Sequence, residues 1–464
     1  MGRVAYALLI GAIVCQLATL LITWPLWQSR DDPPNLPLFS SLPEISFGWV
    51  IVASLIVAAV RPRPGVAIHC GVLATACIFD QYRLEPQFLG IAMLMVACMS
   101  DAGLRVCRWY LAAMWIWAGL HKLLSPDWMG SASWWLVERA GWPPDRTYLQ
   151  FAIAVAASEL VLGVLACWRP NWAARLCVAV HLGIVAFMSP FIADTNYSVI
   201  PWNIAVAVIG YWIFKTVQQR EPVRDFGLPN WELAALVFLL VVPAGFYLGW
   251  VDRSFCHVLY SDNLPRGLIT NKAGTQEIRR TQALAVPFPN ERRLIRQYFE
   301  RTAAVGDKLH IYEQRPMLDD QFFVMHPSGA TEIDEDEFFR LREHEVGGIG
   351  LDRRRSVFAL SRAGVLMKRE EPGAMIYTVA FTPENFDTRL LQYLAGLPNL
   401  QQIDFSRTPI QDEDLAHLKS LRLLTGLGLN HTQVTDAGLR HLRELPYLQN
   451  IESDGTAITG QGVE

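Results

Sequence analysis

The stretch VAYALLIGAIVCQLATLLITW, residues 4–24, decides the fold class, because it holds no charged side chain over the length of a membrane-spanning helix. A helix needs about 20 predominantly apolar residues to cross the hydrocarbon core of a bilayer. Residues 1–3 followed by this apolar run look like a signal peptide. However, no small-x-small cleavage site precedes Pro25, and more apolar segments follow. We therefore expect residues 4–24 to form the first of several spans.

Eight further apolar segments alternate with charged loops up to residue 250. They cover residues 47–60, 66–79, 87–99, 109–124, 149–168, 173–193, 199–217 and 233–250. Three of them are short for a span, and the charged loops between them are what supports their assignment. The sequence thus predicts a polytopic α-helical membrane bundle of about nine spans.

The composition changes near residue 250. Residues 1–250 hold 29 charged side chains, whereas the remaining 214 residues hold 55, and all 16 tryptophans precede residue 251. Tryptophan is enriched at membrane–water interfaces, where its ring and its N–H are both accommodated. We interpret residue 250 as the end of the membrane domain.

Loop charges predict the orientation of the bundle. If the N-terminus is cytoplasmic, the inner loops carry ten Lys and Arg residues and the outer loops carry four. Positive residues accumulate on the cytoplasmic side of membrane proteins. Nine spans then place the C-terminal half outside the cytoplasm. We expect the protein to lie in the inner membrane of the cell.

The last third of the chain repeats with a period of 24 residues. The apolar positions of one repeat recur in the next two: Leu391, Leu394, Leu397, Leu400, Ile403 and Phe405; then Leu415, Leu418, Leu421, Leu424, Leu427 and Leu429; then Leu439, Leu442, Leu445, Leu448 and Ile451. This pattern is typical of leucine-rich repeats, in which each apolar position stacks on its copy one repeat away. We predict a short α/β solenoid.

The region between the membrane domain and the repeats shows mixed patterns. Residues 290–302 read as an amphipathic helix, and residues 308–313, 322–325 and 357–360 read as strands. We therefore expect three domains. They are a membrane domain at 1–250, a small extracytoplasmic α+β domain at 251–365 and leucine-rich repeats at 366–464.

The net charge and the cysteine spacing limit the kinds of partner and metal site that we expect. A net charge of −4 argues against a nucleic-acid partner. The eight cysteines form no C-x-x-C pair and no zinc-ligand spacing, so we expect no metal site and interpret them as small apolar residues packed among helices. The partners we expect are the lipid bilayer and a protein or peptide that binds the repeats.

Among the ionisable side chains inside apolar segments, four stand out: His121, Lys122, Glu159 and His181. Such groups cost free energy in a bilayer and therefore suggest a functional site. A catalytic Glu159–His181 pair is one interpretation, because the two residues lie at similar depth, and an interhelical polar contact without chemistry is the other. Lys122 either extends its ammonium group to the lipid headgroups or serves as a base beneath a lid.

Residues around Lys122 suggest how a flat cofactor could bind there. Trp115 and Ala118 share its helix face at i−7 and i−4, and the small alanine leaves room for a ring. The tryptophan-rich segment that follows, starting at Trp128, is expected to lie over the helix end and shield Lys122 from water.

The stretch WIWAGLHKLLSPDWMGSASWWL, residues 115–136, resembles the membrane core of vitamin K-dependent γ-glutamyl carboxylase and its bacterial HTTM-domain relatives. The residues that match are Gly119, Lys122, Leu123, Asp127, Trp128 and Gly130. The run DQYRLEP at residues 80–86, with Asp80 and Arg83, and the run VPFP at 286–289 also look like bacterial members. The resemblance implies that Lys122 deprotonates a reduced quinone, with His121 in place of a second lysine, and that Asp80 and Arg83 contribute to cofactor binding.

Three functions remain open at this point. The first is a quinol-using membrane enzyme of the carboxylase type that acts on an extracytoplasmic protein held by the soluble domains. The second is a non-catalytic membrane anchor that presents leucine-rich repeats for binding. The third is a DoxX-like redox subunit, a small helical bundle that binds a quinone.

Overall fold

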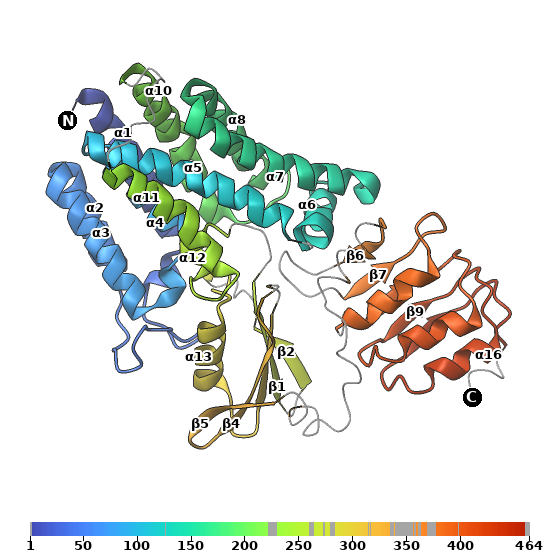
Figure 1. Cartoon of the computed structure of the whole chain (residues 1–464). Coiled ribbons are helices and arrows are strands. Elements are labelled where there is room, and N and C mark those ends of the chain that lie inside the picture. Colours follow the sequence, from blue (N-terminus) through green and yellow to red (C-terminus); the bar gives the residue numbers. More distant parts are fainter. Residues whose placement is uncertain are drawn as a thin grey trace. The chain divides into compact units, whose positions relative to one another are not determined.

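The structure is a computed structural model in which the chain forms two compact units (Figure 1). It describes residues 2–125, 127–220, 230–258, 264–271, 274–278, 284–313, 315, 317–334, 338, 356, 359–360, 363–368, 377–397 and 399–459. Unit 1 comprises Met1–Leu120, Ala156–Leu259 and Leu264–Ile333. Unit 2 comprises His121–Val155, Tyr260–Asn263 and Asp334–Glu464. The three-domain division stays a prediction.

Each of the nine predicted apolar segments contains helix, although residues 189–193 and 247–250 are turns or bends. The longer helices are α1 (Arg3–Ile22), α2 (Gly48–Val60), α3 (Pro62–Phe79), α4 (Pro86–Ala97), α5 (Asp101–Leu123), α7 (Pro144–Trp168), α8 (Pro170–Met188), α10 (Tyr211–Arg220) and α11 (Asn230–Val241). Short turns of helix lie between or beside them: η1 (Trp24–Trp27), η2 (Gln81–Arg83), η3 (Trp128–Ala132), α6 (Ser133–Arg139), η4 (Tyr197–Val199), α9 (Ile200–Ala205), η5 (Val206–Gly210), η6 (Val242–Phe246) and α12 (Arg253–Cys256).

Five helical stretches of the described residues are long and apolar enough to cross a membrane. They are Arg3–Ile22, Pro62–Phe79, Thr147–Trp168, Pro170–Met188 and Tyr197–Val217. The protein is therefore an integral membrane protein that associates with the lipid bilayer. Helices α2, α4 and α11 are shorter, and α5 carries several charged side chains, so the count of nine spans stays a prediction, as do the inner membrane and the orientation.

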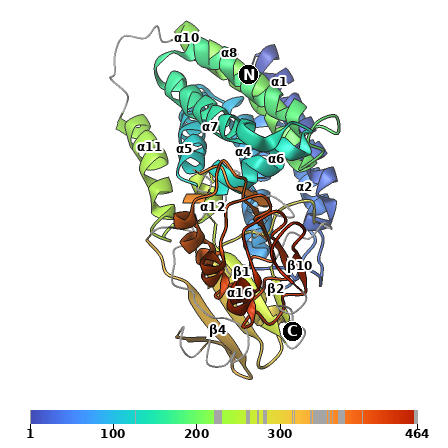
Figure 2. The ribbon, with the colours of Figure 1, turned by 90° about the vertical axis from the view of Figure 1, so that its right-hand side faces the viewer.

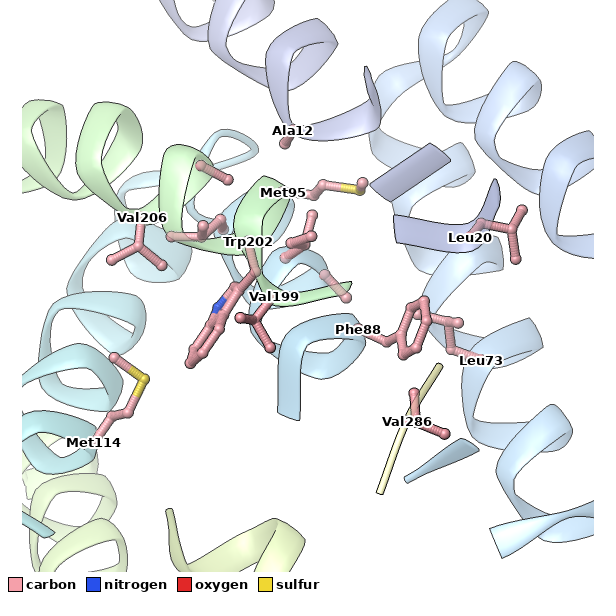
Figure 3. Close-up of a cluster of buried hydrophobic side chains, with 14 of the residues drawn as sticks. Ala12, Leu20, Leu73, Phe88, Met95, Met114, Val199, Trp202, Val206 and Val286 are labelled. Carbon is pink, nitrogen blue, oxygen red and sulfur yellow. The ribbon is translucent and has the colours of Figure 1, made fainter. Parts of the chain in front are cut away.

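Close helix packing builds the core of the membrane bundle. Figure 3 shows side chains of α1, α4 and α9, among them Ala12, Met95 and Trp202, gathered in one buried cluster. Gly90 of α4 lets the Trp202 ring approach, because a Cβ atom at Gly90 would lie 2.5 Å from the indole nitrogen. A short side chain at such positions is how membrane helices gain van der Waals contact.

Unit 1 also contains an antiparallel sheet of five strands in the order β2-β1-β3-β4-β5. Its strands are β1 (Arg266–Asn271), β2 (Gly274–Glu277), β3 (Lys308–Tyr312), β4 (Gln321–His326) and β5 (Gly329–Ile333). Helix α13 (Arg292–Thr302) buries Leu294, Ile295 and Phe299, with Ile295 against β1. The predicted helix and the first two predicted strands are thus confirmed.

The predicted strand at 357–360 is wrong in its described part. Residues 356, 359 and 360 are helical, and residues 357 and 358 lie outside the described residues. A short, continuous apolar run does not distinguish a strand from a buried turn of helix, because it shows neither period.

A buried ionic network lies where the chain leaves the last apolar helix. Arg253 of α12 donates to the Glu85 carboxylate over 3.1 Å, and its backbone N–H donates to Glu291, the residue before α13. Arg293 pairs with Asp252 in the same place. Burial raises the pKa of Glu291 to about 7, with further increase from the Asp252 carboxylate, although Arg315 and Arg253 oppose it. Within unit 1, the network joins α12 to the residue before α4 and to the start of α13.

Unit 2 ends in a second five-stranded sheet, in the order β10-β9-β8-β7-β6. Its strands are β6 (Leu366–Lys368), β7 (Thr378–Ala380), β8 (Gln402–Asp404), β9 (Gly426–Gly428) and β10 (Asn450–Glu452). Strands β7 to β10 are parallel, and their register pairs residues 24 apart, with Val379, Ile403, Leu427 and Ile451 in one row. Strands β7, β8 and β9 each lead into a helical return: η8 (Thr388–Gly396), η9 (Asp412–Leu418), and α16 (Asp436–Leu439) with η10 (Arg440–Leu442).

Polar contacts also recur at the 24-residue interval. Asp412 accepts hydrogen bonds from the backbone N–H and the hydroxyl of Thr435, at 2.7 and 2.6 Å. One turn later, Asp436 accepts the same two bonds from Thr459, at 2.8 and 2.6 Å. We call these contacts the Asp–Thr ladder. Each rung ties one turn of the C-terminal sheet to the next.

We predict that Asp412→Ala destabilises the C-terminal sheet by about 1–3 kcal/mol, because it leaves two donors of Thr435 without their acceptor. The measurement is the rate of proteolysis within residues 377–459 of the full chain as the temperature is raised. Glu413→Ala is the matched control, since Glu413 is exposed on the same helical turn. Equal resistance of the two variants would contradict the structural role of the ladder.

We predict that Glu291→Gln reduces the pH dependence of stability between pH 5 and pH 8. A raised pKa means that the folded protein binds the proton more tightly. The contribution of the protonated Glu291 carboxyl to the free energy of unfolding is therefore fully present below about pH 4.5. It is lost as the pH rises through about 7. The wild type should lose roughly 2–3 kcal/mol over this window, and the variant should not, since glutamine keeps the acceptor oxygen without a proton to lose. Thermal denaturation in detergent at both pH values measures this, and identical pH profiles would contradict it.

Candidate functional site in the membrane helices

A close crossing of α5 and α7 positions the candidate site. A Cβ atom at Gly119 would lie 2.7 Å from the Ala156 carbonyl oxygen, and one at Gly163 would lie 2.8 Å from the Ile116 nitrogen. The two backbones therefore touch at two points one to two turns apart, with glycine on each helix. The helices lie next to one another in both views (Figure 1, Figure 2). Glu159 belongs to the turn of α7 that packs against Gly119.

Two ionisable side chains at the end of α5 are almost fully buried. Lys122 is 2% exposed and His121 is 0% exposed, so the Lys122 ammonium group does not extend into solvent. The cost of removing an ammonium group from water is large unless other groups stabilise it. This burial argues against a lysine that merely extends to lipid headgroups, one of the two interpretations of Lys122 from the sequence.

The tryptophan-rich segment forms a helical cap beside Lys122. We use the name cap for η3 and α6 together, residues 128–139. Ser125 accepts a hydrogen bond from the Trp128 backbone N–H over 3.0 Å, and the Trp128 indole donates to the Ala152 carbonyl of α7 over 3.1 Å. These bonds fix the Trp128 ring, whose centroid lies 5.4 Å from the Lys122 ammonium nitrogen. That distance is within the range of a cation–π interaction.

His181 belongs to a hydrogen-bonded chain across three helices. The Trp115 indole N–H donates to His181 Nε2 over 2.9 Å, and His181 Nδ1 lies 2.7 Å from the Asn203 amide oxygen. An indole nitrogen only donates, so Nε2 is the acceptor and Nδ1 carries the proton. Asn203 completes the chain by donating to the Val199 carbonyl. Both nitrogens of the neutral imidazole are thus engaged, which favours the interpretation of His181 as a polar contact between α5, α8 and α9.

The remaining candidates of the bundle are buried as well. Ala118 lies one turn before Lys122 and is 1% exposed, and Glu159 of α7 is 8% exposed. His181 is bonded to Trp115 and Asn203 rather than to Glu159. Convergence of Lys122 and His121 with Glu159 and His181 on one site stays a prediction, and so do the catalytic and cofactor-binding roles of these residues.

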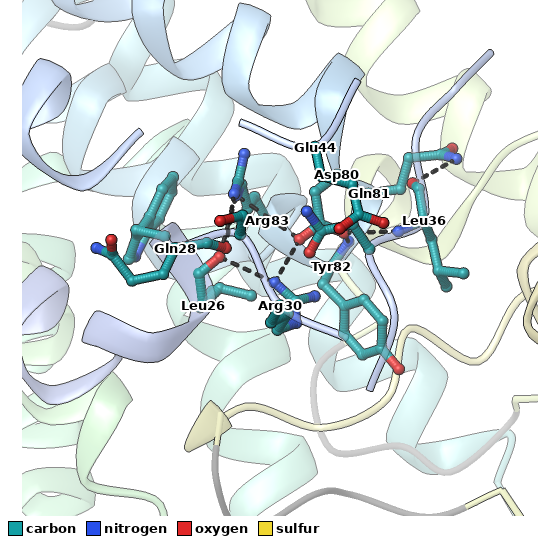
Figure 4. Close-up of polar contacts among 12 residues, drawn as sticks. Leu26, Gln28, Arg30, Leu36, Glu44, Asp80, Gln81, Tyr82 and Arg83 are labelled. Carbon is teal, nitrogen blue, oxygen red and sulfur yellow. Dashed lines mark hydrogen bonds and ion pairs between the residues drawn. The ribbon is translucent and has the colours of Figure 1, made fainter. Parts of the chain in front are cut away.

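Asp80 and Arg83 form a cluster with Arg30 in the loops next to α3 (Figure 4). Asp80 pairs with Arg30 over 2.7 Å and accepts two backbone N–H groups, from Leu36 and Tyr82. Arg83 donates to four backbone carbonyls, those of Leu26, Gln28, Ile45 and Ala76. These contacts hold three loop segments together and support a structural role. Cofactor binding by Asp80 and Arg83 stays a prediction.

Sequence reasoning missed several polar residues that the structure shows in buried contacts. Asn203 was overlooked because only ionisable side chains were sought in the apolar segments, although an amide in a span also needs partners. Glu232 lies directly before the apolar segment 233–250 and was not considered, yet it is buried and pairs with Arg105 of α5. Arg30 was counted as an outer-loop charge. A search for every polar residue within or beside the apolar segments would have found all three.

Comparison with known families gives one match. Residues 100–198 match the family model described as "Methylamine utilisation protein MauE", a membrane protein family. The matched segment contains α5, the cap, α7 and α8, and thus the four ionisable candidates. No curated protein and no solved structure matches the chain.

The expected resemblance to γ-glutamyl carboxylase and the HTTM domain is wrong. The family match over the same helices is to MauE, and no carboxylase or HTTM family matches. The residues that suggested the resemblance have general roles at a helix end. Gly119 allows close helix packing, and tryptophan is common at membrane interfaces. A pattern of such residues over about 20 positions does not distinguish one membrane family from another.

We predict that Gly119→Ala lowers the stability of the membrane bundle by about 1–3 kcal/mol, because the new methyl group meets backbone atoms that have no freedom to move aside. The measurement is the midpoint of thermal denaturation in detergent, followed by size-exclusion chromatography. Gly183→Ala in α8 is the control, since a Cβ atom there meets nothing within 4 Å. If both variants denature like the wild type, the close crossing of α5 and α7 is not present in the protein.

Proposed function

We propose that this protein is a redox-related membrane protein in which the end of α5 and the cap bind the ring of a quinone. The observation that carries the proposal is the nearly complete burial of Lys122 beside the Trp128 ring. A buried ammonium group inside a membrane segment suggests a functional site. The MauE match over residues 100–198 favours a redox-related membrane role for these helices.

The chemistry of the side chains fits a quinone. The ammonium group of Lys122 donates hydrogen bonds, and the imidazole of His121 next to it in the sequence donates or accepts one. A quinone carbonyl accepts such bonds, and a flat ring packs against an aromatic face such as that of Trp128. When bound, the quinone supplies the quinone/quinol redox couple, which exchanges two electrons and two protons.

The chain's own residues would bind and orient the ring. Lys122 would hold one carbonyl oxygen and stabilise negative charge on it, while the cap would exclude water from the ammonium group. Low local polarity strengthens that interaction. The structure describes all eight cysteines and shows no disulfide among them, so a disulfide of this chain is not part of the proposal.

A second candidate function is binding of a protein or peptide by the C-terminal sheet. The observation that favours it is the parallel pairing of β7 to β10 at a constant 24-residue interval, which supports a short leucine-rich repeat solenoid. Repeat arrays use their extended surfaces for binding. The protein could then act as a membrane anchor, with or without the quinone site.

The test is quinone binding by the purified protein and by Lys122→Ala. A short-chain ubiquinone and menadione serve as probes, and tryptophan fluorescence quenching gives the dissociation constant. We expect Lys122→Ala to weaken binding of at least one probe about 10- to 100-fold, because a hydrogen bond from a charged donor is worth about 1.5–3 kcal/mol. Mass spectrometry of the lipid extract shows whether a native quinone is lost as well.

Lys215→Ala is the matched control. Lys215 also lies over an aromatic ring, at 5.8 Å from the Tyr211 centroid, but its ammonium group is in an exposed hydrogen bond to Asn171. We expect this variant to bind the probes like the wild type. Wild-type affinity of Lys122→Ala for both probes would exclude the quinone proposal and leave the anchor as the better one.

A further inference from the structure

The cap of the candidate site contacts the C-terminal sheet within unit 2. Strand β6 packs against both η3 and α6. The Lys368 ammonium nitrogen lies 3.8 Å from the Glu138 carboxylate and 5.4 Å from the centroid of the Trp134 ring. One cation of the sheet thus meets both an acidic and an aromatic side chain of the cap.

Side chains alternate along β6, so the two faces of the strand make different contacts. Met367 is buried in the core of the C-terminal sheet, so its neighbours Leu366 and Lys368 point to the opposite face. Lys368 on that face meets the cap. The strand therefore belongs to the sheet on one side and supports the cap on the other.

Hydrogen bonds connect the supported part of the cap to the wall beside Lys122. The Ser133 hydroxyl, at the start of α6, lies 2.6 Å from the carbonyl oxygen of Trp128 and 3.2 Å from that of Gly130. The Trp128 ring in turn lies against the Lys122 ammonium group. The backbone of Trp128 is therefore bonded to the start of α6 within a short segment of the cap.

We infer that Lys368 is a positioning residue through which the C-terminal sheet holds the cap against Lys122. The site at the end of α5 is then complete only when the sheet is folded and docked on α6. This inference rests on the proposed function for the ligand of the site, but the contact between β6 and the cap stands independently of it. A protein bound to the sheet would act on the membrane site by this route.

The test is hydrogen–deuterium exchange of the full chain in detergent, without added quinone. In Lys368→Glu, two carboxylates face each other and the cation is removed from the Trp134 ring. We expect exchange in residues 128–139 to become about three- to tenfold faster, as for the loss of an ion pair and a cation–π contact. The charge-exchanged double variant Glu138→Lys with Lys368→Glu should recover most of the protection.

Lys419→Glu makes the same change of charge at an exposed position of the C-terminal sheet and serves as the control. Unchanged exchange of the cap in Lys368→Glu, or equal acceleration in Lys419→Glu, would overturn the inference. So would failure of the double variant to recover.

Probe affinity is the second readout, because a merely structural contact would not change it. We expect the affinity for the quinone probe to fall in Lys368→Glu and to recover in the double variant. Faster exchange with unaltered affinity would show that the cap does not serve the site, which also overturns the inference. The proposed function fails separately, when Lys122→Ala binds the probes like the wild type.

Discussion

The close crossing of α5 and α7 is the contact on which the candidate site depends. Lipid tails are as apolar as leucine side chains, so membrane helices are not driven together by the removal of apolar surface from water. They associate where small residues bring their backbones into van der Waals contact, as Gly119 and Gly163 do here. The crossing fixes the rotation of α5, and that rotation determines which way Lys122 points.

Buried polar groups in this protein are satisfied by specific partners rather than by solvent. Arg83 binds four backbone carbonyls of the loops around it, and His181 is engaged at both ring nitrogens. Each contact also limits what the residue is free to do. A neutral imidazole with both nitrogens occupied links helices well, but it accepts a proton only after one of its bonds has broken.

The sequence predicted those parts of the fold that depend on local patterns. Apolar segments located the helices, and the 24-residue period located the row of Val379, Ile403, Leu427 and Ile451. The contact between Lys122 and Trp128 was also anticipated, because the two lie close along the chain. The partners of His181 were not anticipated, because Trp115 and Asn203 come from distant segments and no local pattern pairs them. The sequence pattern also did not predict the division into two units, because the boundaries fall inside α5 and α7.

The Asp–Thr ladder has a consequence for how such a chain can change in length. Each rung joins residues 23 apart, so these bonds tie a turn of the C-terminal sheet only to the turn next to it. Duplication or deletion of one 24-residue unit at the β10 end of the sheet therefore leaves in place β6, the strand that contacts the cap. At position 460, where the next rung would begin, the sequence has glycine in place of aspartate. The array can therefore gain or lose whole turns at its β10 end without a change in the strand that supports the cap.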